Sequence, residues 1–229
     1  MVGKLIVFEG GEGAGKTTQI TALHTWLQTD SWVQTLLEKK RISDICVTRE
    51  PGGSELGQAI RHLLLDYVPA SDHAAIAPPT ELLLYAADRA QHVEQYLRHH
   101  LTRNALILCD RYTDSTVAYQ GYGRELDLQL IHTLNQIATG GLQPDLTFWL
   151  DLDVEAGLSR TRKRGQADRM EKNDQAFHQR VRTGFQALAH EHPHRIKRID
   201  ANRNVDAIAD EIQTVLRQKL MEWYDKIDA

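Results

Sequence analysis

Eight residues near the N-terminus have the types and spacing needed to hold a phosphate chain. They match the pattern G-x-x-x-x-G-K-[ST] and read Gly10-Gly11-Glu12-Gly13-Ala14-Gly15-Lys16-Thr17. The glycines let the backbone turn so that several N–H groups point at one anion. Lys16 can reach the β- and γ-phosphates, and the Thr17 hydroxyl can bind Mg²⁺. The motif therefore predicts a site for a nucleoside triphosphate.

Two further candidate sites follow apolar runs of the chain. Asp110 ends one run, where a carboxylate can hold Mg²⁺ or its water shell, and Arg111 comes next. Arg49 ends another run, inside Thr48-Arg49-Glu50-Pro51-Gly52-Gly53. Ligands of parallel sheets bind at the carboxyl ends of strands, so these arginines could hold a second phosphate group. The alternative interpretation of Asp110 is an aspartate that only caps the end of a buried strand. The alternative for the segment from Thr48 to Gly53 is a plain turn.

Two other patterns could serve a nucleotide. Tyr85 and Arg89 are four residues apart and share one face of a helix, where a ring and a guanidinium can sandwich a base. A core tyrosine and a solvated arginine are the alternative. The segment 160–172 contains six basic and two acidic residues, a net charge of +4. Such a run is usually a solvated helix, but phosphoryl transfer needs cations to neutralise the transferred group.

The elements that must position these residues alternate along the chain. Five short apolar runs predict buried strands, at Lys4–Glu9, Ile45–Arg49, Ala105–Asp110, Leu146–Leu152 and Arg195–Asp200. Helical patterns separate them. This alternation predicts right-handed crossovers and a parallel sheet with helices on both faces.

Several helix ends can also be predicted. Thr80 is a candidate N-cap for a helix that reaches Leu101, and Asn204 is a candidate cap for the final helix. Gly140-Gly141 is expected to stop the helix before it. Three polar segments lie between these elements. Asp30–Ser43 is interpreted as a loop or helix end, Val68–Pro79 as a loop, and Arg160–Lys172 as a mobile surface segment.

The overall composition is ordinary and excludes several classes of protein. The 229 residues are 41% hydrophobic and 25% charged, which suits one folded domain and excludes dominant disorder. The longest apolar run, Leu82–Ala87, is far shorter than the roughly 20 residues of a membrane span. The N-terminal apolar stretch is too short for a signal peptide, so we expect a cytoplasmic protein. The net charge of −4 gives no case for nucleic-acid binding.

Together these residues resemble one family, thymidylate kinase (dTMP kinase), along essentially the whole chain. The markers are Phe8-Glu9-Gly10 before the loop, Thr48 to Gly53, Tyr85 with Arg89, and the run from Asp110 to Gly121. The resemblance implies one domain, 1–229, with a flexible LID around 160–172. Its expected fold is the three-layer α/β fold of P-loop nucleoside-monophosphate kinases, a five-stranded parallel sheet with helices on both faces.

The resemblance also implies an activity and its partners. The expected reaction is ATP + dTMP → ADP + dTDP, with Mg²⁺, in the synthesis of dTTP. The expected protein is a homodimer that uses neither a nucleic acid nor a membrane.

The resemblance assigns site residues by position. Those expected to contact ATP are Gly10, Gly11, Glu12, Gly13, Ala14, Gly15, Lys16, Thr17, Thr18, Arg160, Ala201 and Asn202. Those expected to contact dTMP are Glu12, Arg49, Pro51, Tyr85, Arg89, Arg111, Ser115, Thr116, Tyr119 and Gln120. Thr17 and Asp110 are the expected metal site.

Some of these residues have more specific expected roles. Glu12 is expected to receive the deoxyribose 3′-hydroxyl, and Arg111 to grip the dTMP phosphate. Arg89 is expected to hydrogen-bond the thymine carbonyl, while Tyr119 helps to exclude a ribose 2′-hydroxyl. Tyr85 stands where the family commonly has Phe, and its ring can still stack on a base.

The catalytic cation is expected to come from the LID. One arrangement in the family places an arginine inside the phosphate loop, and here that position is Gly13. The basic LID then resembles the bacterial arrangement, in which LID arginines stabilise the transferring phosphoryl group. The expected catalytic residues are Lys16, Glu12, Arg111, Arg162, Arg164 and Arg169.

Two other functions are left open by the residues themselves. One is another nucleoside-monophosphate or deoxynucleoside kinase, and the other is a nucleotide-binding regulator without catalysis. The chain has no N-K-x-D guanine-reading motif, which disfavours a GTPase, and it is short for most motor ATPases.

Overall fold

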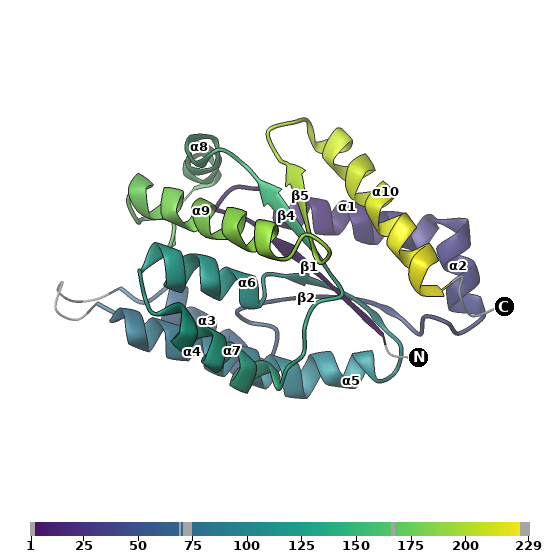
Figure 1. Ribbon diagram of the computed structural model, residues 1–229, viewed down its shortest axis with the longest axis horizontal. Coiled ribbons are helices and arrows are strands. Elements are labelled where there is room, and N and C mark those ends of the chain that lie inside the picture. The colour runs from purple at the N-terminus through teal and green to yellow at the C-terminus, as the bar shows by residue number, and fades with distance from the viewer. Residues whose placement is uncertain (1–2, 69, 71–74, 166–167, 225–229) are drawn as a thin grey trace.

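The computed structural model is organised around one five-stranded parallel sheet (Figure 1), and it describes residues 3–68, 70, 75–165 and 168–224. The strand order is β2-β3-β1-β4-β5. The strands are β1 (Lys4–Glu9), β2 (Ile45–Arg49), β3 (Leu106–Asp110), β4 (Leu146–Asp151) and β5 (Ile196–Asp200). All five predicted strands are confirmed, with each end within one residue of its expected place.

Helices cover both faces of the sheet, as expected. One face carries α1 (Lys16–Thr29), α2 (Ser31–Glu38) and α10 (Val205–Tyr224). The sheet separates the hydrophobic core on this face from the one on the opposite face, as strand β1 shows. Ile6 and Phe8 pack on this face, while Leu5 and Val7 pack on the other, because successive side chains of a strand alternate.

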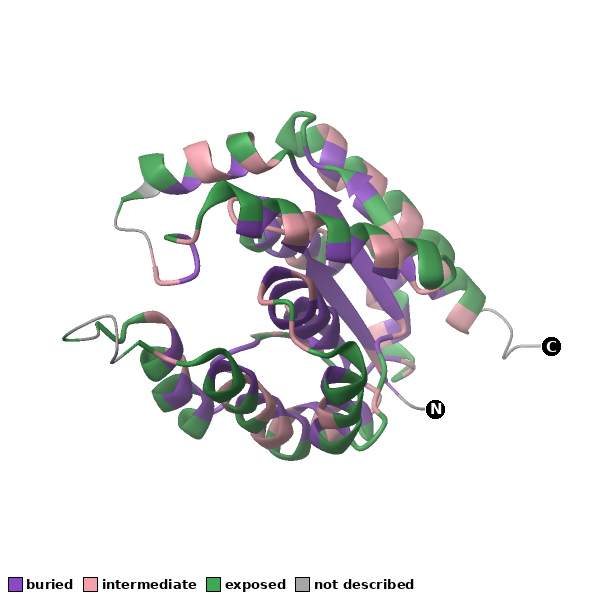
Figure 2. Ribbon diagram, turned by 60° about the vertical axis from the view of Figure 1, so that its left-hand side comes forward, coloured by how far each residue is buried: buried purple, intermediate pink, exposed green. Residues whose placement is uncertain are grey.

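The opposite face is covered by a larger set of helices. They are α4 (Pro78–His92), a π-helical segment η2 (Val93–Leu97), α5 (Arg98–Leu101), α6 (Thr113–Thr116), a second π-helical segment η3 (Val117–Gly123), α7 (Leu128–Thr139) and α9 (Gln175–Glu191). Two more helices, α3 (Glu55–Leu65) and α8 (Val154–Arg164), pack on α4 and α9 respectively. Figure 2 shows that the central strands of the sheet are buried while the helices expose their outer faces; the edge strands β2 and β5 keep some exposed residues.

Side-chain caps explain several helix starts. Asn204 Oδ1 accepts the N–H of Ala207 at 2.7 Å, which confirms it as the cap of α10. Asp30 accepts the N–H groups of Trp32 and Val33, and this cap starts α2 where the sequence suggested a loop or helix end. Gly140 ends α7 in the left-handed conformation, as predicted.

Three expectations are corrected by the structure. Thr80 does not cap α4, which begins at Pro78 because proline at the first helical positions needs no N–H partner. The predicted loop Val68–Pro79 therefore loses its last two residues to the helix, and positions 69 and 71–74 lie outside the described residues. Part of the segment 160–172 belongs to α8, and positions 166–167 again lie outside the description.

None of the described helices is long and apolar enough to cross a membrane.

Candidate active site

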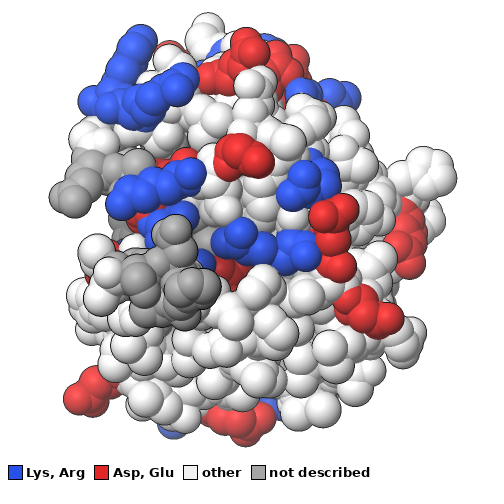
Figure 3. All heavy atoms as spheres, turned by 90° about the vertical axis from the view of Figure 1, so that its left-hand side faces the viewer, with Lys and Arg blue, Asp and Glu red and all other residues white. Residues whose placement is uncertain are grey.

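A cavity of about 620 Å³ opens at the carboxyl edge of the sheet. The strand register explains why the candidate residues meet there. Asp110 of β3 lies beside Phe8 of β1 on one side and beside Arg49 of β2 on the other. On this side of the molecule, Figure 3 shows several Lys and Arg side chains across the middle of the surface, with Asp and Glu side chains among them.

The phosphate loop, 10–17, joins β1 to α1 in the strand–loop–helix context that the motif requires. Gly15 has a φ of 91° and caps α1, and Gly13 has a φ of 67°. A Cβ atom on Gly13 would lie 2.4 Å from the carbonyl oxygen of Gly157 in α8. The close approach of α8 therefore leaves no room for a side chain at position 13, and Arg160 of α8 donates to the Gly13 carbonyl at 3.3 Å instead.

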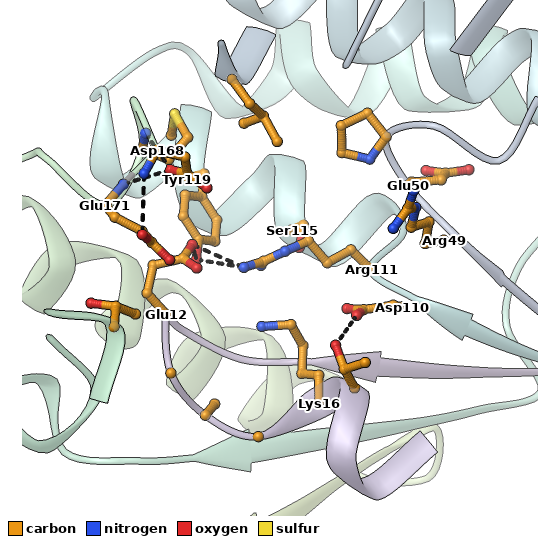
Figure 4. A pocket seen from close by; sticks show the side chains of 18 of the residues that line it. Glu12, Lys16, Arg49, Glu50, Asp110, Arg111, Ser115, Tyr119, Asp168 and Glu171 are labelled. Carbon is orange, nitrogen blue, oxygen red and sulfur yellow. Dashed lines mark hydrogen bonds and ion pairs between the residues drawn. The ribbon is translucent and has the colours of Figure 1, made fainter. Parts of the chain in front are cut away.

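The ammonium group of Lys16 lies over the loop from which it comes. Its Nζ donates to the carbonyl oxygens of Gly10 and Gly11, each at 3.1 Å. Burial, and then the charge of Arg111, lower the pKa of Lys16. Figure 4 shows Lys16 and Arg111 pointing into the same space. Two cations that face one cavity create a site that an anion would stabilise.

The structure brings together the two residues of the expected metal site, Thr17 and Asp110, and their role stays a prediction. Thr17 Oγ1 donates to Asp110 Oδ2 at 3.3 Å, a contact drawn in Figure 4. The other carboxylate oxygen, Asp110 Oδ1, is buried and has no hydrogen-bond partner among the described residues. An unpartnered buried carboxylate oxygen beside a hydroxyl suits a hard cation such as Mg²⁺, which completes its shell with phosphate oxygens and water.

Arg111 donates hydrogen bonds to four acceptors across the middle of the cavity. Its backbone is in the left-handed region, with a φ of 72°. One terminal nitrogen donates to the Gly10 carbonyl at 3.1 Å and to Ser115 Oγ at 3.2 Å. The other donates to Glu12 Oε1 at 2.9 Å and to the Tyr119 hydroxyl at 3.1 Å. The guanidinium is thus held in place before any substrate arrives.

Glu12 stays ionised in this setting. Burial by itself raises its pKa, but the charges of Arg111 and Lys16 and a hydrogen bond from Tyr119 lower the pKa of Glu12 to about 2. The Tyr119 hydroxyl donates to Glu12 Oε1 at 2.6 Å. The carboxylate can therefore accept a further hydrogen bond from a substrate hydroxyl at neutral pH.

Glu9, at the end of β1, anchors the segment that carries Arg111. Its carboxylate accepts the N–H groups of Tyr112 and Ser115, at 2.8 and 3.1 Å, and the Ser115 hydroxyl at 2.6 Å. Burial and the nearby charge of Asp114 raise the pKa of Glu9 from 4.5 to about 7, against the opposing charge of Arg111.

The raised pKa of Glu9 predicts a pH dependence of stability. The folded state holds the Glu9 proton more tightly than the unfolded state, so the contribution of this group to stability falls as pH rises from 4.5 towards 7. We expect the free energy of unfolding of Glu9→Gln to fall less than that of the wild type between about pH 5 and pH 8. Denaturant titrations across this range measure the difference, and Glu94→Gln, on the surface, is the control. Equal pH slopes in the wild type and Glu9→Gln would contradict the prediction.

Arg89 is a buried member of the cavity wall, with 2% of its surface exposed. Its Nε donates to Glu50, one terminal nitrogen donates to Thr116 and Asn135, and the other donates to the Tyr112 carbonyl. An arginine has five N–H donors, so these four bonds leave one for a ligand.

The residues assigned to dTMP by resemblance are brought together completely, although their roles stay predictions. All ten line this one cavity: Glu12, Arg49, Pro51, Tyr85, Arg89, Arg111, Ser115, Thr116, Tyr119 and Gln120.

The residues assigned to ATP are brought together in part. Arg160 and the loop from Glu12 to Thr18 line the cavity. Ala201 is buried and Asn202 is exposed, and neither lines it. The neighbouring side chains Arg203 and Val205 form that part of the wall instead.

The two expected LID arginines whose side chains the structure describes, Arg162 and Arg169, do not converge. Arg162 is exposed and does not line the cavity. The side chain of Arg164 lies outside the described part of the chain. Arg169 pairs with buried Glu81 of α4, at 2.6 Å, and donates to the Leu64 carbonyl at the end of α3. Arg169 therefore ties the turn after α8 to two helices of the opposite wall.

Sequence reasoning missed several residues of the cavity. Arg61 of α3 lines it and donates to the Pro51 carbonyl at 3.0 Å. Glu50 lies within a segment that the sequence singled out, but its burial against α4 has no local signal. The others, which carry no motif, include Gln19, Leu65, Asp168, Met170, Glu171 and Arg203.

Comparisons with known proteins all point to one family. The family model described as thymidylate kinase matches residues 8–212. A thymidylate kinase of Acaryochloris marina is 57% identical, over 98% of this chain and all of the relative. One of Cyanothece sp. is 54% identical, over 99% of each chain. The crystal structure of thymidylate kinase from Ehrlichia chaffeensis superposes with a TM-score of 0.71 at 31% identity, covering 95% of this chain and all of that one.

Proposed function

The chain belongs to the thymidylate kinase family, and from this premise we propose how its residues carry out the reaction. The enzyme transfers the γ-phosphoryl group of ATP to dTMP and gives ADP and dTDP. One observation supports the proposed assignment of roles above all others. A single cavity places the phosphate loop and the predicted dTMP residues on either side of Arg111.

We propose that dTMP lies with its base against Tyr85 and Arg89 and its phosphate against Arg111. The one N–H of Arg89 that its four hydrogen bonds leave over then donates to a carbonyl of the base. The loop and Lys16 hold the phosphates of ATP on the other side. No strong general base is needed, because the attacking phosphate oxygen is already an anion. Positioning and charge stabilisation then account for most of the rate.

Glu12 and Tyr119 complete the sugar site in this proposal. The ionised Glu12 accepts the 3′-hydroxyl of the deoxyribose, while Arg111 and Tyr119 fix the position of the carboxylate. The buried ring of Tyr119 lies close by and leaves little space for a 2′-hydroxyl.

A substrate panel tests this function directly. The purified protein is incubated with ATP and a set of nucleoside monophosphates and nucleosides, including dTMP, dUMP and thymidine. We expect dTMP to have the highest kcat/KM. Turnover of thymidine but not dTMP would contradict the proposal, and so would ATP binding without transfer to any member of the panel.

We propose Mg²⁺ as the cofactor, held by the Thr17 hydroxyl and, directly or through water, by Asp110. Bound there, the ion would neutralise charge on the β- and γ-phosphates. Asp110→Asn is expected to weaken binding of MgATP about tenfold and to change binding of metal-free ATP little, because an amide lacks the charge that favours the ion. Calorimetric titrations with and without Mg²⁺ measure both affinities. Asp210→Asn, on the exposed face of α10, is the control, and equal losses for the two ligands would contradict the assignment.

We also propose a homodimer that acts in the cytoplasm. The neighbouring helices α3, α4 and α7 expose large apolar side chains, which include Leu56, Leu63, Leu83, Leu130 and Ile137. Clustered apolar side chains on adjacent helices are typical of an interface between subunits. Light scattering tests the dimer, which should have twice the chain mass of 26.0 kDa.

A further inference from the structure

The direction of the Arg89 guanidinium depends on a second layer of side chains behind it. Arg89 emerges from α4 and reaches the cavity through the protein interior. Its Nε donates to Glu50 Oε2 at 2.8 Å, and this is its only ion pair among the described residues. The terminal nitrogens are also held by Thr116, Asn135 and the Tyr112 carbonyl, so Glu50 supplies the one charged contact among these four. A shift of the Glu50 carboxylate would move Nε, and with it the plane of the guanidinium whose remaining N–H faces the base.

The carboxylate of Glu50 has a second partner, which contacts the oxygen that does not pair with Arg89. It follows β2, between two residues of the cavity wall, Arg49 and Pro51, and only 4% of its surface is exposed. Its second oxygen, Oε1, lies 2.9 Å from His92 Nδ1. The two oxygens thus face two different partners on α4, and the carboxylate has one orientation that satisfies both.

His92 is fully buried and lies one turn after Arg89 on α4. A carboxylate paired with arginine only accepts hydrogen bonds, so His92 Nδ1 carries the hydrogen of this contact. The other ring nitrogen, Nε2, lies 2.7 Å from the Thr48 hydroxyl, which can donate to it. Thr48, His92 and Glu50 form a continuous chain of hydrogen bonds that ends on Arg89.

The ring of His92 has no freedom to swing away from this position. A Cβ atom on Gly53 would lie 2.4 Å from His92 Cδ2, so the turn after β2 is folded closely over the ring. On another side, the ring stacks on Tyr96 with centroids 5.6 Å apart. The imidazole is therefore fixed both by packing and by its two hydrogen bonds.

We propose that His92 is a positioning residue for recognition of the base. Together with Thr48 it orients Glu50, and Glu50 orients the N–H that Arg89 presents to the base. This inference rests on the proposed function, in which Arg89 donates to a carbonyl of the base, and it takes that carbonyl to be O4 of thymine. Cytosine has an amino group at that position and cannot accept this bond. The chain from Thr48 to Arg89 thereby sets the preference for dTMP over dCMP.

His92→Phe tests this role, because it keeps a ring between Gly53 and Tyr96 and removes both hydrogen bonds. We expect KM for dTMP to rise about tenfold and the ratio of kcat/KM for dTMP to that for dCMP to fall about tenfold. The kcat and the KM for ATP should stay within about twofold of the wild type. His92→Asn, whose amide can donate to Glu50, should recover most of the discrimination. Tyr96→Phe is the matched control, since Tyr96 contacts the ring without reaching Glu50.

The outcomes separate positioning from a purely structural role. A lower thermal unfolding temperature in His92→Phe, with unchanged KM for dTMP and unchanged discrimination, would overturn the proposal. Should His92→Phe not fold, Thr48→Val removes the outer hydrogen bond alone and is expected to raise KM for dTMP about threefold. An unchanged KM in that variant would also overturn it. Turnover of dTMP by the wild type, measured first, tests the proposed function separately.

Discussion

Replacing Arg111 with alanine is expected to lower kcat/KM for dTMP about a thousandfold, because one side chain serves two purposes. Its guanidinium can hold the acceptor phosphate, and it also pairs with the partly buried carboxylate of Glu12, which it holds in position. Tyr119 and Glu12 keep the pKa of Arg111 well above its usual range in spite of burial, so the cation is present at every working pH. The loss should appear in both kcat and KM, measured by steady-state kinetics with varied dTMP.

Two variants make the Arg111 experiment specific. Arg111→Lys keeps the charge but loses the planar fork that contacts four acceptors, so we expect an intermediate loss. Arg103→Ala removes an exposed arginine from the turn before β3 and should leave the kinetics unchanged. Near-normal use of dTMP by Arg111→Ala would rule out its assignment to the acceptor phosphate.

Replacing Arg162 and Arg164 together with alanine is expected to lower kcat on the order of a thousandfold, with a smaller effect on KM for dTMP. The physical reason lies in the phosphate loop. Position 13 is glycine and lies against Gly157, so the loop cannot supply a cation for the transferring phosphoryl group. Lys163→Ala, in the same helical segment, is the matched control. Single-turnover measurements separate the chemical step from product release.

Arg169 calls for a different expectation from Arg162 and Arg164, the other two arginines of the expected LID. Because it pairs with buried Glu81 and the Leu64 carbonyl, its removal should weaken the closure of the cavity and raise KM for dTMP. A loss of kcat in Arg169→Ala as large as that of the double variant would show that Arg169 leaves Glu81 during turnover. If the double variant keeps kcat within about tenfold of the wild type, the cation comes from elsewhere, and Arg160, which lines the cavity, is the next candidate.

Much of the fold and site was predictable because the signals are local. Continuous apolar runs identified the five strands, since strands covered on both faces need apolar residues throughout. The phosphate loop was recognisable because its function depends on consecutive backbone groups. Five of the predicted dTMP residues lie at or just after strand ends or on the helix face of Tyr85 and Arg89, so a parallel sheet in the correct register brings them to one edge. The other five lie in the phosphate loop and in α6 and η3, which follow β3 in the chain.

Other features were not predictable because they depend on distant parts of the chain. The pairing of Glu81 with Arg169 spans α4 and the turn after α8, and nothing near either residue indicates it. Arg61 reaches the cavity only because α3 packs against α4. The error at Thr80 has a different origin. Thr80 is of a type that often caps helices, but Pro78 and Pro79 start the helix before it, because proline at the first helical positions needs no N–H partner.

The sequence by itself therefore determined the family, the order of strands and helices, and the groups that hold phosphate, because each is encoded in short patterns of residue type. Only the tertiary structure decided how those groups are oriented. It placed Gly13 against α8, left one oxygen of Asp110 without a partner among the residues it describes, and fixed Arg89 through Glu50 and His92. Orientation depends on hydrogen bonds and packing between segments far apart in the chain, and a linear pattern does not record those contacts.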